Sequence, residues 1–310
     1  MSAKGKFIPV MLTPFKDNGE VDFDGLVALT EFYINAGAKG LFANCLSSEM
    51  FELSKEERLQ VTKCVVDVAN GRVPVVSTGT FGGPIAEQAE FVKEIYATGA
   101  SAVIAITSLL AEESDSDEVL DQNVLELIEL TPGVPLGFYE CPVPYKRVLK
   151  PAQLAKYVAT GRVVYHKDTC LDLEAVQEKI NLCKGDSFEL YDAYMVNAVS
   201  SQVAGAAGLS CIQGNFVPEL VVWLCDNYAD ESKSEQVEIA QNFFVDNMDV
   251  MHNVYPIIAK YFLQKRGFGI SLYTRREVGN FTPQIAADID GLYERYVTLK
   301  SQIGLEDIQF

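Results

Sequence analysis

One lysine of this chain stands where its amine could do covalent chemistry. In GRVVYHKDTC, Lys167 comes at the end of an apolar run. A lysine in such a place is poorly solvated, which disfavours the ammonium form and lowers the pKa. The free amine that results attacks carbonyl carbons and forms a Schiff base. The alternative is a surface lysine in a loop, or one that pairs with the adjacent Asp168.

Hydroxyl groups at two other places could assist that amine. Tyr139 lies in PLGFYECP, and a phenol there could pass protons to and from a carbinolamine on Lys167. Ser47 and Ser48 lie in NCLSSEM, where the hydroxyl and N–H groups of a turn could bind a carboxylate. A core tyrosine and simple turn-capping serines are the structural alternatives.

The remaining reactive side chains indicate neither a metal site nor an organic cofactor. Seven cysteines are scattered without a CxxC pair, and Cys45, Cys141 and Cys170 are most simply interpreted as buried thiols. Two histidines are too few for a histidine-rich metal centre. His166 precedes Lys167 and should face the other side of its strand, so we interpret it as structural.

Short apolar runs recur along the whole chain and are typical of strands that are buried on both faces. Each is five or six residues long and shows almost no polar alternation. Eight such strands are expected, over Phe7–Leu12, Gly40–Cys45, Pro74–Gly79, Ala102–Thr107, Pro135–Glu140, Val163–Asp168, Phe188–Asp192 and Gly208–Ile212.

Helical patterns lie between these runs and after the last one. Ser54 with Glu57 forms a capping box, and Pro84 and Pro151 stand where first-turn prolines belong. Thr282 before a proline is a further helix start. Beyond the eighth strand, helices are expected over Pro218–Tyr228, Ser234–Met251, Tyr255–Lys265 and Pro283–Ser301.

This alternation predicts an α/β fold in which residues 1–225 form a (β/α)₈ barrel and residues 226–310 form a helical extension packed on it. A doubly wound open sheet competes, but no GxGxxG follows the first strand. Reactive residues of a barrel lie at the carboxyl ends of its strands. The polar residues at or just after those ends include Ser47, Ser48, Tyr139, Glu140, Lys167 and Asp192.

The charge of the chain limits its partners. A net charge of −18 argues against nucleic acid and against an anionic membrane surface, because both are bound by clustered lysine and arginine. No apolar stretch approaches the length of a membrane span, and the polar start Met1–Lys6 does not resemble a signal peptide. We therefore expect a reduced, cytoplasmic protein that acts on a small molecule.

The ordered motifs of the chain resemble one family over nearly its full length. FIPVMLTPF, NGEVDFDGL, CLSSEMFELSKEER, YECP, HKDTC and AGAAGLSCIQGN follow one another as in the dihydrodipicolinate synthase / N-acetylneuraminate lyase family of class I aldolases. The resemblance implies a (β/α)₈ barrel, an active site at the barrel mouth, a homo-oligomer (dimer or tetramer) and no metal or organic cofactor.

The resemblance also implies roles for individual residues. Lys167 is similar to the imine-forming lysine, and Tyr139 to the tyrosine that relays protons. Ser47 matches a threonine that binds the carboxylate of pyruvate, with Ser48 replacing a glycine beside it. Ser210 stands where the family offers a backbone carbonyl near the bound keto acid.

Several positions depart from the pattern of dihydrodipicolinate synthase. Pro144 stands where that synthase has an arginine for its second substrate, and Leu110 where it has a tyrosine that reaches a neighbouring subunit. Leu46 replaces a threonine. Glu140 replaces the usual asparagine and could pair with Lys146 or Arg147 or contact a polyhydroxylated or amine-bearing substrate. Asp192 suits either a sugar-acid lyase or the synthase.

The expected activity is reversible aldol cleavage of pyruvate-type or longer 2-oxo (sugar) acids through an imine on Lys167. A dehydratase or synthase using the same imine is the first alternative. A catalytically silent paralogue that binds a keto acid is the second, suggested by the altered motif residues. The residues that would choose the second half of the substrate are those that depart from the family pattern.

Overall fold

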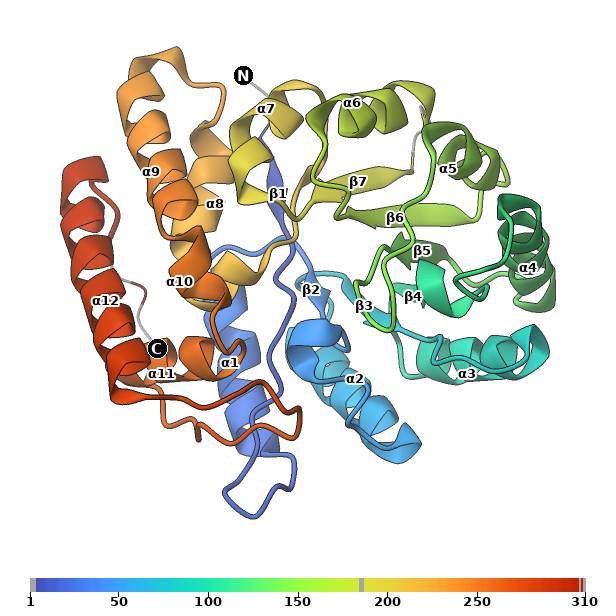
Figure 1. Ribbon diagram of the computed structural model, residues 1–310, viewed down its shortest axis with the longest axis horizontal. Helices are drawn as coiled ribbons and strands as arrows, with labels where there is room; N and C mark the ends of the chain where they lie inside the picture. Colours follow the sequence, from blue (N-terminus) through green and yellow to red (C-terminus); the bar gives the residue numbers. More distant parts are fainter. Residues whose placement is uncertain (1–3, 184–186, 307, 309–310) are drawn as a thin grey trace.

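The computed structural model describes residues 4–306 apart from 184–186, together with residue 308 (Figure 1). The first half of the Met1–Lys6 segment therefore lies outside the described residues. Eight parallel strands curl into a barrel, each connected to the next by at least one helix. The strands are β1 (Lys6–Phe7), β2 (Leu41–Phe42), β3 (Val75–Thr78), β4 (Ala102–Ile106), β5 (Leu136–Tyr139), β6 (Val163–Asp168), β7 (Glu189–Asp192) and β8 (Gly208–Leu209).

The strand order closes the sheet on itself. Neighbours run β1-β8-β7-β6-β5-β4-β3-β2, and a parallel bridge between Val10 and Phe42 joins the first strand segment to the second. All eight expected strands are present, and several are shorter than expected. The ladder hydrogen bonds at their ends give way to turns such as the 3₁₀ turn η1 (Leu46–Ser48) after β2. The predicted (β/α)₈ barrel is confirmed.

Helices surround the barrel and continue beyond it. The barrel helices are α1 (Phe23–Asn35), α2 (Lys55–Ala69), α3 (Ile85–Ala97), α4 (Asp117–Leu130), α5 (Pro151–Val158), α6 (Leu173–Leu182), α7 (Ala198–Val203) and α8 (Pro218–Asn227). The C-terminal extension holds α9 (Ser234–Asp246), α10 (Met248–His252), α11 (Ile257–Lys265) and α12 (Pro283–Ile303). No helix in the described part of the chain has the length and apolar character that crossing a bilayer requires.

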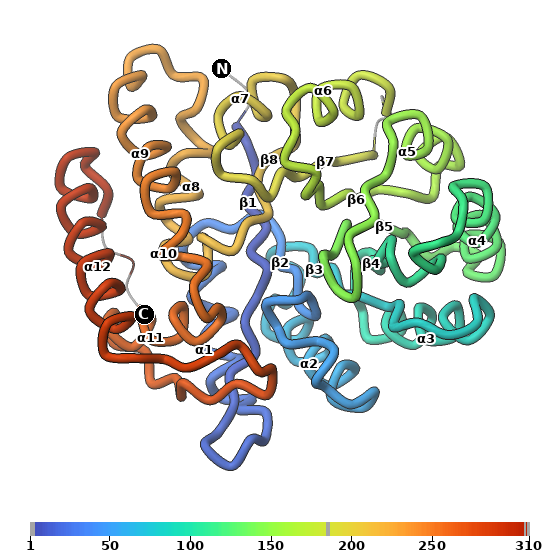
Figure 2. The backbone as a smooth tube through the Cα atoms, viewed as in Figure 1, coloured from blue at the N-terminus to red at the C-terminus, as the bar shows by residue number. Residues whose placement is uncertain are grey.

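The extension packs on one side of the barrel, and its segment between α11 and α12 returns to the loop that precedes α1. Helix α11 and helix α12 pack on each other, and α12 also packs on α9. Figure 2 shows the segment between α11 and α12 passing beside the loop that precedes α1. Ser271 donates a hydrogen bond to Asp17 there, and Arg275 donates one to the Gly19 carbonyl. This segment belongs to the barrel mouth as much as to the extension.

Aromatic rings fill the barrel interior below the mouth. The Phe42 ring lies 5.9 Å from that of Tyr139 and 6.0 Å from that of Tyr165, both edge-on. Tyr165 stacks on Tyr191 at 5.0 Å. Interdigitated rings of this size leave little freedom to the strands that carry them. The residues one layer above, at the strand ends, therefore stand on a rigid base.

Closure between β1 and β8 requires a glycine. A Cβ on Gly208, whose φ is +157°, would lie 1.7 Å from the Lys6 carbonyl oxygen. We expect Gly208→Ala to lower the free energy of unfolding by about 3 kcal/mol or more, because backbone atoms cannot move aside cheaply. Urea unfolding measures the loss. Gly269→Ala is the matched control, because a Cβ there meets nothing within 4 Å; equal losses in both variants would contradict the prediction.

Candidate active site

Three of the predicted site residues line one cavity at the barrel mouth. The cavity has a volume of about 560 Å³ and is lined by Lys167, Tyr139 and Ser47 among others. Residues of the C-terminal extension close its other side: Met248, Asp249, His252, Tyr255 and Arg276. Barrel and extension thus build the cavity together, although only the barrel supplied candidates at the level of sequence.

The Lys167 amine is buried and has no polar partner. The register of β5 on β6 sets Tyr139 opposite Lys167, and Nζ lies 4.2 Å from the centroid of the Tyr139 ring. Lys167 is 3% exposed and forms no hydrogen bond or ion pair with another described residue. Burial lowers its pKa. A larger fraction of this amine is therefore unprotonated than in a solvated lysine.

The Tyr139 hydroxyl keeps its proton at neutral pH. Burial raises the pKa of Tyr139 well above its ordinary value, and the neighbouring Cys141 adds to the rise by accepting a hydrogen bond from the phenol. A protonated phenol beside an amine can donate a proton and recover it, which is the property that a proton relay needs.

Two further hydroxyl groups, those of Ser47 and Tyr255, line the same cavity. The Ser47 hydroxyl is hydrogen-bonded to the Tyr255 hydroxyl, which also accepts a hydrogen bond of 2.5 Å from Asn215 Nδ2. Ser47 is 4% exposed. Tyr255 and Asn215 were not identified from the sequence, because Tyr255 belongs to the extension and reaches the cavity only in the folded chain.

Ser48 and Ser210 do not line the cavity. The Ser48 hydroxyl is fully buried under the η1 turn, where it donates a hydrogen bond of 2.6 Å to the Met11 carbonyl. The Ser210 hydroxyl donates to the Ile8 carbonyl at 2.9 Å and accepts from Tyr165 at 3.2 Å. This corrects the expectation that the Ser48 side chain contacts a substrate, since its hydroxyl serves the barrel wall. The role expected of Ser210 concerns its backbone carbonyl and stays a prediction.

Glu140 and Asp192 point away from the cavity, toward the helices. Both Glu140 oxygens are occupied: Oε1 accepts from the Leu149 N–H at 3.0 Å and Oε2 from the Thr169 N–H at 3.0 Å. Asp192 Oδ1 accepts from the Tyr194 N–H at 2.8 Å. The expectation that these carboxylates contact a substrate is therefore corrected, because successive residues of a strand face opposite sides.

Comparison with known proteins places this barrel and cavity in one family. The sequence model of the dihydrodipicolinate synthetase family matches residues 3–291. The chain belongs to that family. Membership sets it among Schiff-base-forming pyruvate aldolases and synthases of class I, an assignment that leaves its reaction and substrate open.

The relatives are distant, so this is a divergent family member. A 4-hydroxy-tetrahydrodipicolinate synthase of Shewanella piezotolerans is 23% identical over 285 residues, covering 92% of this chain and 94% of its own. One from Shewanella sp. ANA-3 is 26% identical over 219 residues, or 71% and 73% of the two chains.

Solved structures show the same fold at similar distance. The Escherichia coli K12 prophage protein YagE, crystallised with pyruvate, superposes with a TM-score of 0.83 at 21% identity, covering 99% of this chain and all of that one. A dihydrodipicolinate synthase crystal structure gives 0.83 at 24% identity and covers 96% of this chain and 100% of that one.

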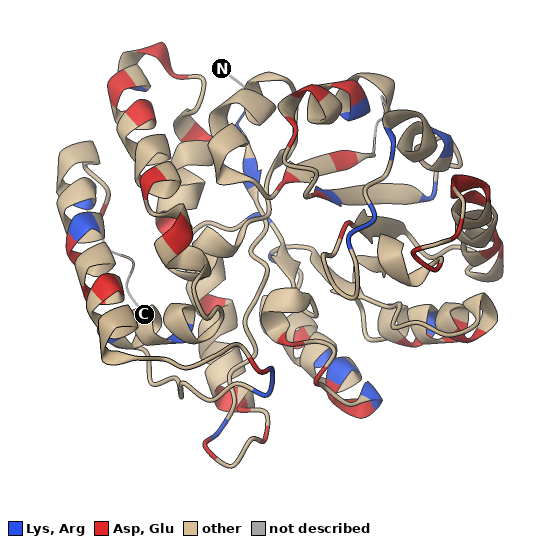
Figure 3. Cartoon of the chain, viewed as in Figure 1, with Lys and Arg blue, Asp and Glu red and all other residues tan. Residues whose placement is uncertain are grey.

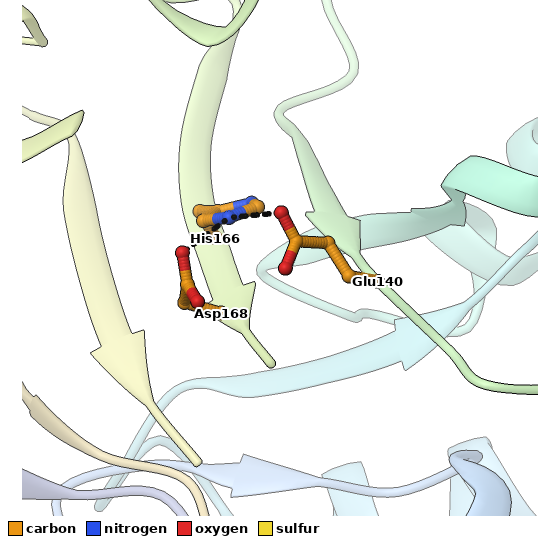
Figure 4. A group of neighbouring side chains, drawn as sticks. All are labelled: Glu140, His166 and Asp168. Carbon is orange, nitrogen blue, oxygen red and sulfur yellow. Dashed lines mark ion pairs between the residues drawn. The ribbon is translucent and has the colours of Figure 1, made fainter. Parts of the chain in front are cut away.

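Behind β6, this family member carries a buried cluster of four charged side chains, and Figure 4 shows three of them, Glu140, His166 and Asp168. Lys179 of α6 donates 2.6 Å hydrogen bonds to both Glu140 and Asp168. His166 Nε2 lies 3.3 Å from Glu140 and 3.4 Å from Asp168. All four side chains are fully buried. His166 thus faces the helices and lies on the far side of the strand from the cavity.

Within the cluster, opposite charges outweigh the cost of burial. Burial alone would lower the pKa of Lys179, but Glu140 and Asp168 raise it above its ordinary value. Burial would likewise raise the pKa of Asp168, which His166 and Lys179 hold well below the usual range. The same two carboxylates raise the pKa of His166 against the effect of burial. Lys179, Asp168 and His166 therefore favour their charged forms.

Glu140, His166 and Asp168 also have the composition of a metal site. One ligand atom of each lies within 4.8 Å of the others. However, the Lys179 ammonium bonds both carboxylates at 2.6 Å and so fills the place of a cation. A divalent ion would have to displace a buried charge that already neutralises the oxygens. We assign the cluster a structural role.

Lys179→Met should destabilise the protein strongly. Two buried carboxylates would lose their ammonium, and breaking a buried pair costs about 3–5 kcal/mol. Lys150→Met is the matched control, because Lys150 pairs with Asp117 at a side-chain exposure of 71% and exposed pairs contribute about 1 kcal/mol or less. Urea unfolding of both variants tests this; a loss in Lys179→Met no larger than in the control would contradict it.

Asp192→Asn should flatten the dependence of stability on pH. Burial raises the pKa of Asp192 to about 7, with the nearby Asp168 adding to the rise. The folded chain therefore holds a proton that the unfolded chain has lost, and stability falls as the pH rises from about 4 to about 7. The variant lacks this decline and should be more stable than wild type above about pH 7.

Free energies of unfolding at about pH 5 and about pH 8 measure the effect of Asp192. The exposed Asp246 provides the control variant Asp246→Asn, which should keep the wild-type difference between the two conditions. An Asp192→Asn protein with the same difference as wild type would show that Asp192 does not titrate in this way.

Proposed function

We propose that this protein is a class I aldolase that reversibly cleaves a 2-oxo acid through a Schiff base on Lys167. The single observation that carries the proposal is the Lys167 amine, which is buried, unpaired among the described residues and open to a cavity of about 560 Å³. A solvated or salt-bridged lysine would remain an ammonium ion and could not attack a carbonyl.

The first stage joins the amine to the substrate. Lys167 Nζ attacks the C2 carbonyl carbon and forms a carbinolamine. Tyr139 passes one proton from the nitrogen to the C2 oxygen, and a second proton, taken up from solvent, lets that hydroxyl leave as water. The product is a protonated imine, and its positive charge makes it an electron sink.

The second stage breaks the carbon–carbon bond. The hydroxyl on C4 loses its proton, and its carbon becomes an aldehyde as the C3–C4 bond breaks. The electron pair of that bond moves into the imine and forms an enamine on Lys167. Protonation at C3 and addition of water then release pyruvate and restore the free amine. Every step is reversible, so the same site can add an aldehyde to pyruvate.

The carboxylate beside C2 is proposed to lie against Ser47 and Tyr255. Both hydroxyls line the cavity and are already hydrogen-bonded to each other. Because Tyr255 accepts from both Ser47 and Asn215, its own O–H group is free to donate to an anion, whereas the Ser47 proton is already used in the bond to Tyr255. Hydroxyl donors hold a carboxylate without a permanent charge that would disturb the imine.

Two positions favour an aldolase over the synthase. Leu110, in place of the synthase's inter-subunit tyrosine, is 1% exposed and packs in the core, so it offers no hydroxyl. Pro144, in place of an arginine, cannot bind a carboxylate through a side chain. YagE, with the same fold, was crystallised with pyruvate, which agrees with the keto acid proposed here. All seven cysteines are free thiols, which supports a reducing, cytoplasmic setting, and a homo-oligomer is proposed from family membership.

Borohydride reduction in the presence of pyruvate tests the imine. We expect a stable mass adduct on the Lys167 peptide of the wild-type chain and none on Lys167→Met, since reduction traps only a lysine that has formed a Schiff base. Lys150→Met, which removes an exposed lysine, should keep the adduct. The proposal would be contradicted by an adduct that persists in Lys167→Met, or by the absence of any adduct in the wild-type protein with every 2-oxo acid tested.

Tyr139→Phe separates proton transfer from binding. The ring that packs against Lys167 is retained, while the hydroxyl is lost. We expect kcat to fall by about 10²–10⁴-fold with little change in KM, the range of general acid–base effects. Stopped-flow measurement of imine formation with pyruvate should show the same slowing. An unchanged kcat would remove Tyr139 from the mechanism.

A further inference from the structure

Arg276 is distinguished from the other arginines by its lack of partners. The chain has eight arginines, and the guanidinium groups of Arg58, Arg72, Arg147, Arg162, Arg266, Arg275 and Arg295 all donate hydrogen bonds to oxygen atoms. The Arg276 guanidinium forms no hydrogen bond or ion pair with another described residue, yet the residue is half-buried and lines the Lys167 cavity. Burial raises the pKa of the Glu52 carboxylate and the Arg276 charge lowers it in part, but no hydrogen bond or ion pair joins the two, so the planar guanidinium is left to bind another anion.

The backbone of Arg276 is fixed by a buried carboxylate. Glu49, at the end of the η1 turn, accepts from the Arg275 N–H at 2.6 Å and from the Arg276 N–H at 2.9 Å through Oε2. Its Oε1 accepts from Lys260 at 3.1 Å, and both side chains are fully buried. Arg275 is further tied to Glu57 by two hydrogen bonds of 2.6 Å. Arg276 is therefore held at the cavity by its main chain, and its side chain is left unbonded.

The cavity wall is positively charged in an acidic protein. Acidic residues are spread over the surrounding helices (Figure 3), and the net charge is −18. Yet even with Lys167 as a neutral amine, the cavity lining holds two cations, Lys146 and Arg276, against one carboxylate, Asp249. His252 lies beside them, with Nδ1 2.7 Å from the Met248 carbonyl. Such a local excess of cations attracts an anionic ligand.

The Gln213 side chain is a second, independent observation that indicates a ligand contact in this cavity. Its side chain lines the cavity and is 1% exposed, and its Nε2 contacts Met248 Sδ at 3.4 Å. The Oε1 atom is buried without a hydrogen-bond partner among the described residues. A buried amide oxygen without a donor is costly and uncommon in folded proteins. A hydroxyl group on a bound substrate would supply the missing donor.

We propose that Arg276 and Gln213 form a second subsite, which binds a distal carboxylate and a hydroxyl of the substrate. This inference rests on the proposed function and gives its substrate class: a hydroxylated 2-oxo acid with a carboxylate at each end. The carboxylate beside C2 already has Ser47 and Tyr255, so the Arg276 charge is available for the second one. Cleavage then yields pyruvate and an aldehyde that carries a carboxylate, and a reaction that consumes such an aldehyde acid must follow.

Kinetics of Arg276→Met with matched substrates test this subsite. The substrates are a 4-hydroxy-2-oxo diacid and the 4-hydroxy-2-oxo monoacid in which a methyl group replaces the distal carboxylate. Wild type should prefer the diacid, and the variant should lose about 10–100-fold in kcat/KM for the diacid, the effect of one hydrogen bond to a charged group. Its kcat/KM for the monoacid and its pyruvate adduct should not change.

Arg72→Met is the matched control, because it removes the same charge from a surface pair with Glu31 and should leave both substrates unaffected. Gln213→Leu tests the hydroxyl contact. It should weaken inhibition by a 2-oxo diacid that carries a 4-hydroxyl more than inhibition by one without it. Circular dichroism and thermal unfolding establish that each variant is folded.

Two results would overturn the subsite. Equal losses of kcat/KM for diacid and monoacid in Arg276→Met would show that Arg276 does not bind the distal carboxylate. Loss of the pyruvate adduct in a folded Arg276→Met would place the arginine on the carboxylate beside C2 instead. If wild type itself forms no adduct, the proposed aldolase reaction fails separately. Calorimetric binding of the diacid to wild type and Arg276→Met then still decides whether Arg276 binds the distal group.

Discussion

The Lys179 ammonium holds together the ends of the two strands that carry the reactive pair. It bonds Glu140 after β5 and Asp168 at the end of β6, each at 2.6 Å and without solvent. The chain neighbours of those carboxylates, Tyr139 and Lys167, point the opposite way into the cavity. The two faces of the wall are therefore coupled through the backbone: the charged cluster fixes the strand ends, and the strand ends fix the distance from the amine to the phenol.

This division of charge also suits the chemistry. Glu140 and Asp168 are neutralised on the helix side by Lys179 and His166. The pKa of the Lys167 amine is therefore set by burial, which lowers it, and by the neighbouring cysteines, which raise it. A free carboxylate beside the amine would stabilise the ammonium form and raise its pKa. Glu140, which departs from the family pattern, thus supports the site from behind the strand. Its partner is Lys179, 39 residues away in the sequence, and not the expected Lys146 or Arg147.

The C-terminal extension contributes part of the cavity lining and, in the proposed function, part of the substrate contacts. The barrel contributes the amine, the phenol and Ser47, whereas Tyr255 and Arg276 come from beyond residue 226. The buried pair of Glu49 with Lys260 connects these two parts of the chain directly. Substitutions in the extension can therefore change what binds above the imine while the imine chemistry itself stays untouched.

The sequence by itself determined the eight apolar strands, the barrel they form and the candidates Lys167, Tyr139 and Ser47, because strand burial and strand-end position are local properties. It did not determine orientation: a one-residue difference at a strand end turns a side chain from the cavity to the helices, which is why Glu140 and Asp192 were misplaced. Lys179 and Arg276 were not identified at all. Their roles depend on contacts between distant segments, and only tertiary packing decides which buried charges meet and which guanidinium is left for a ligand.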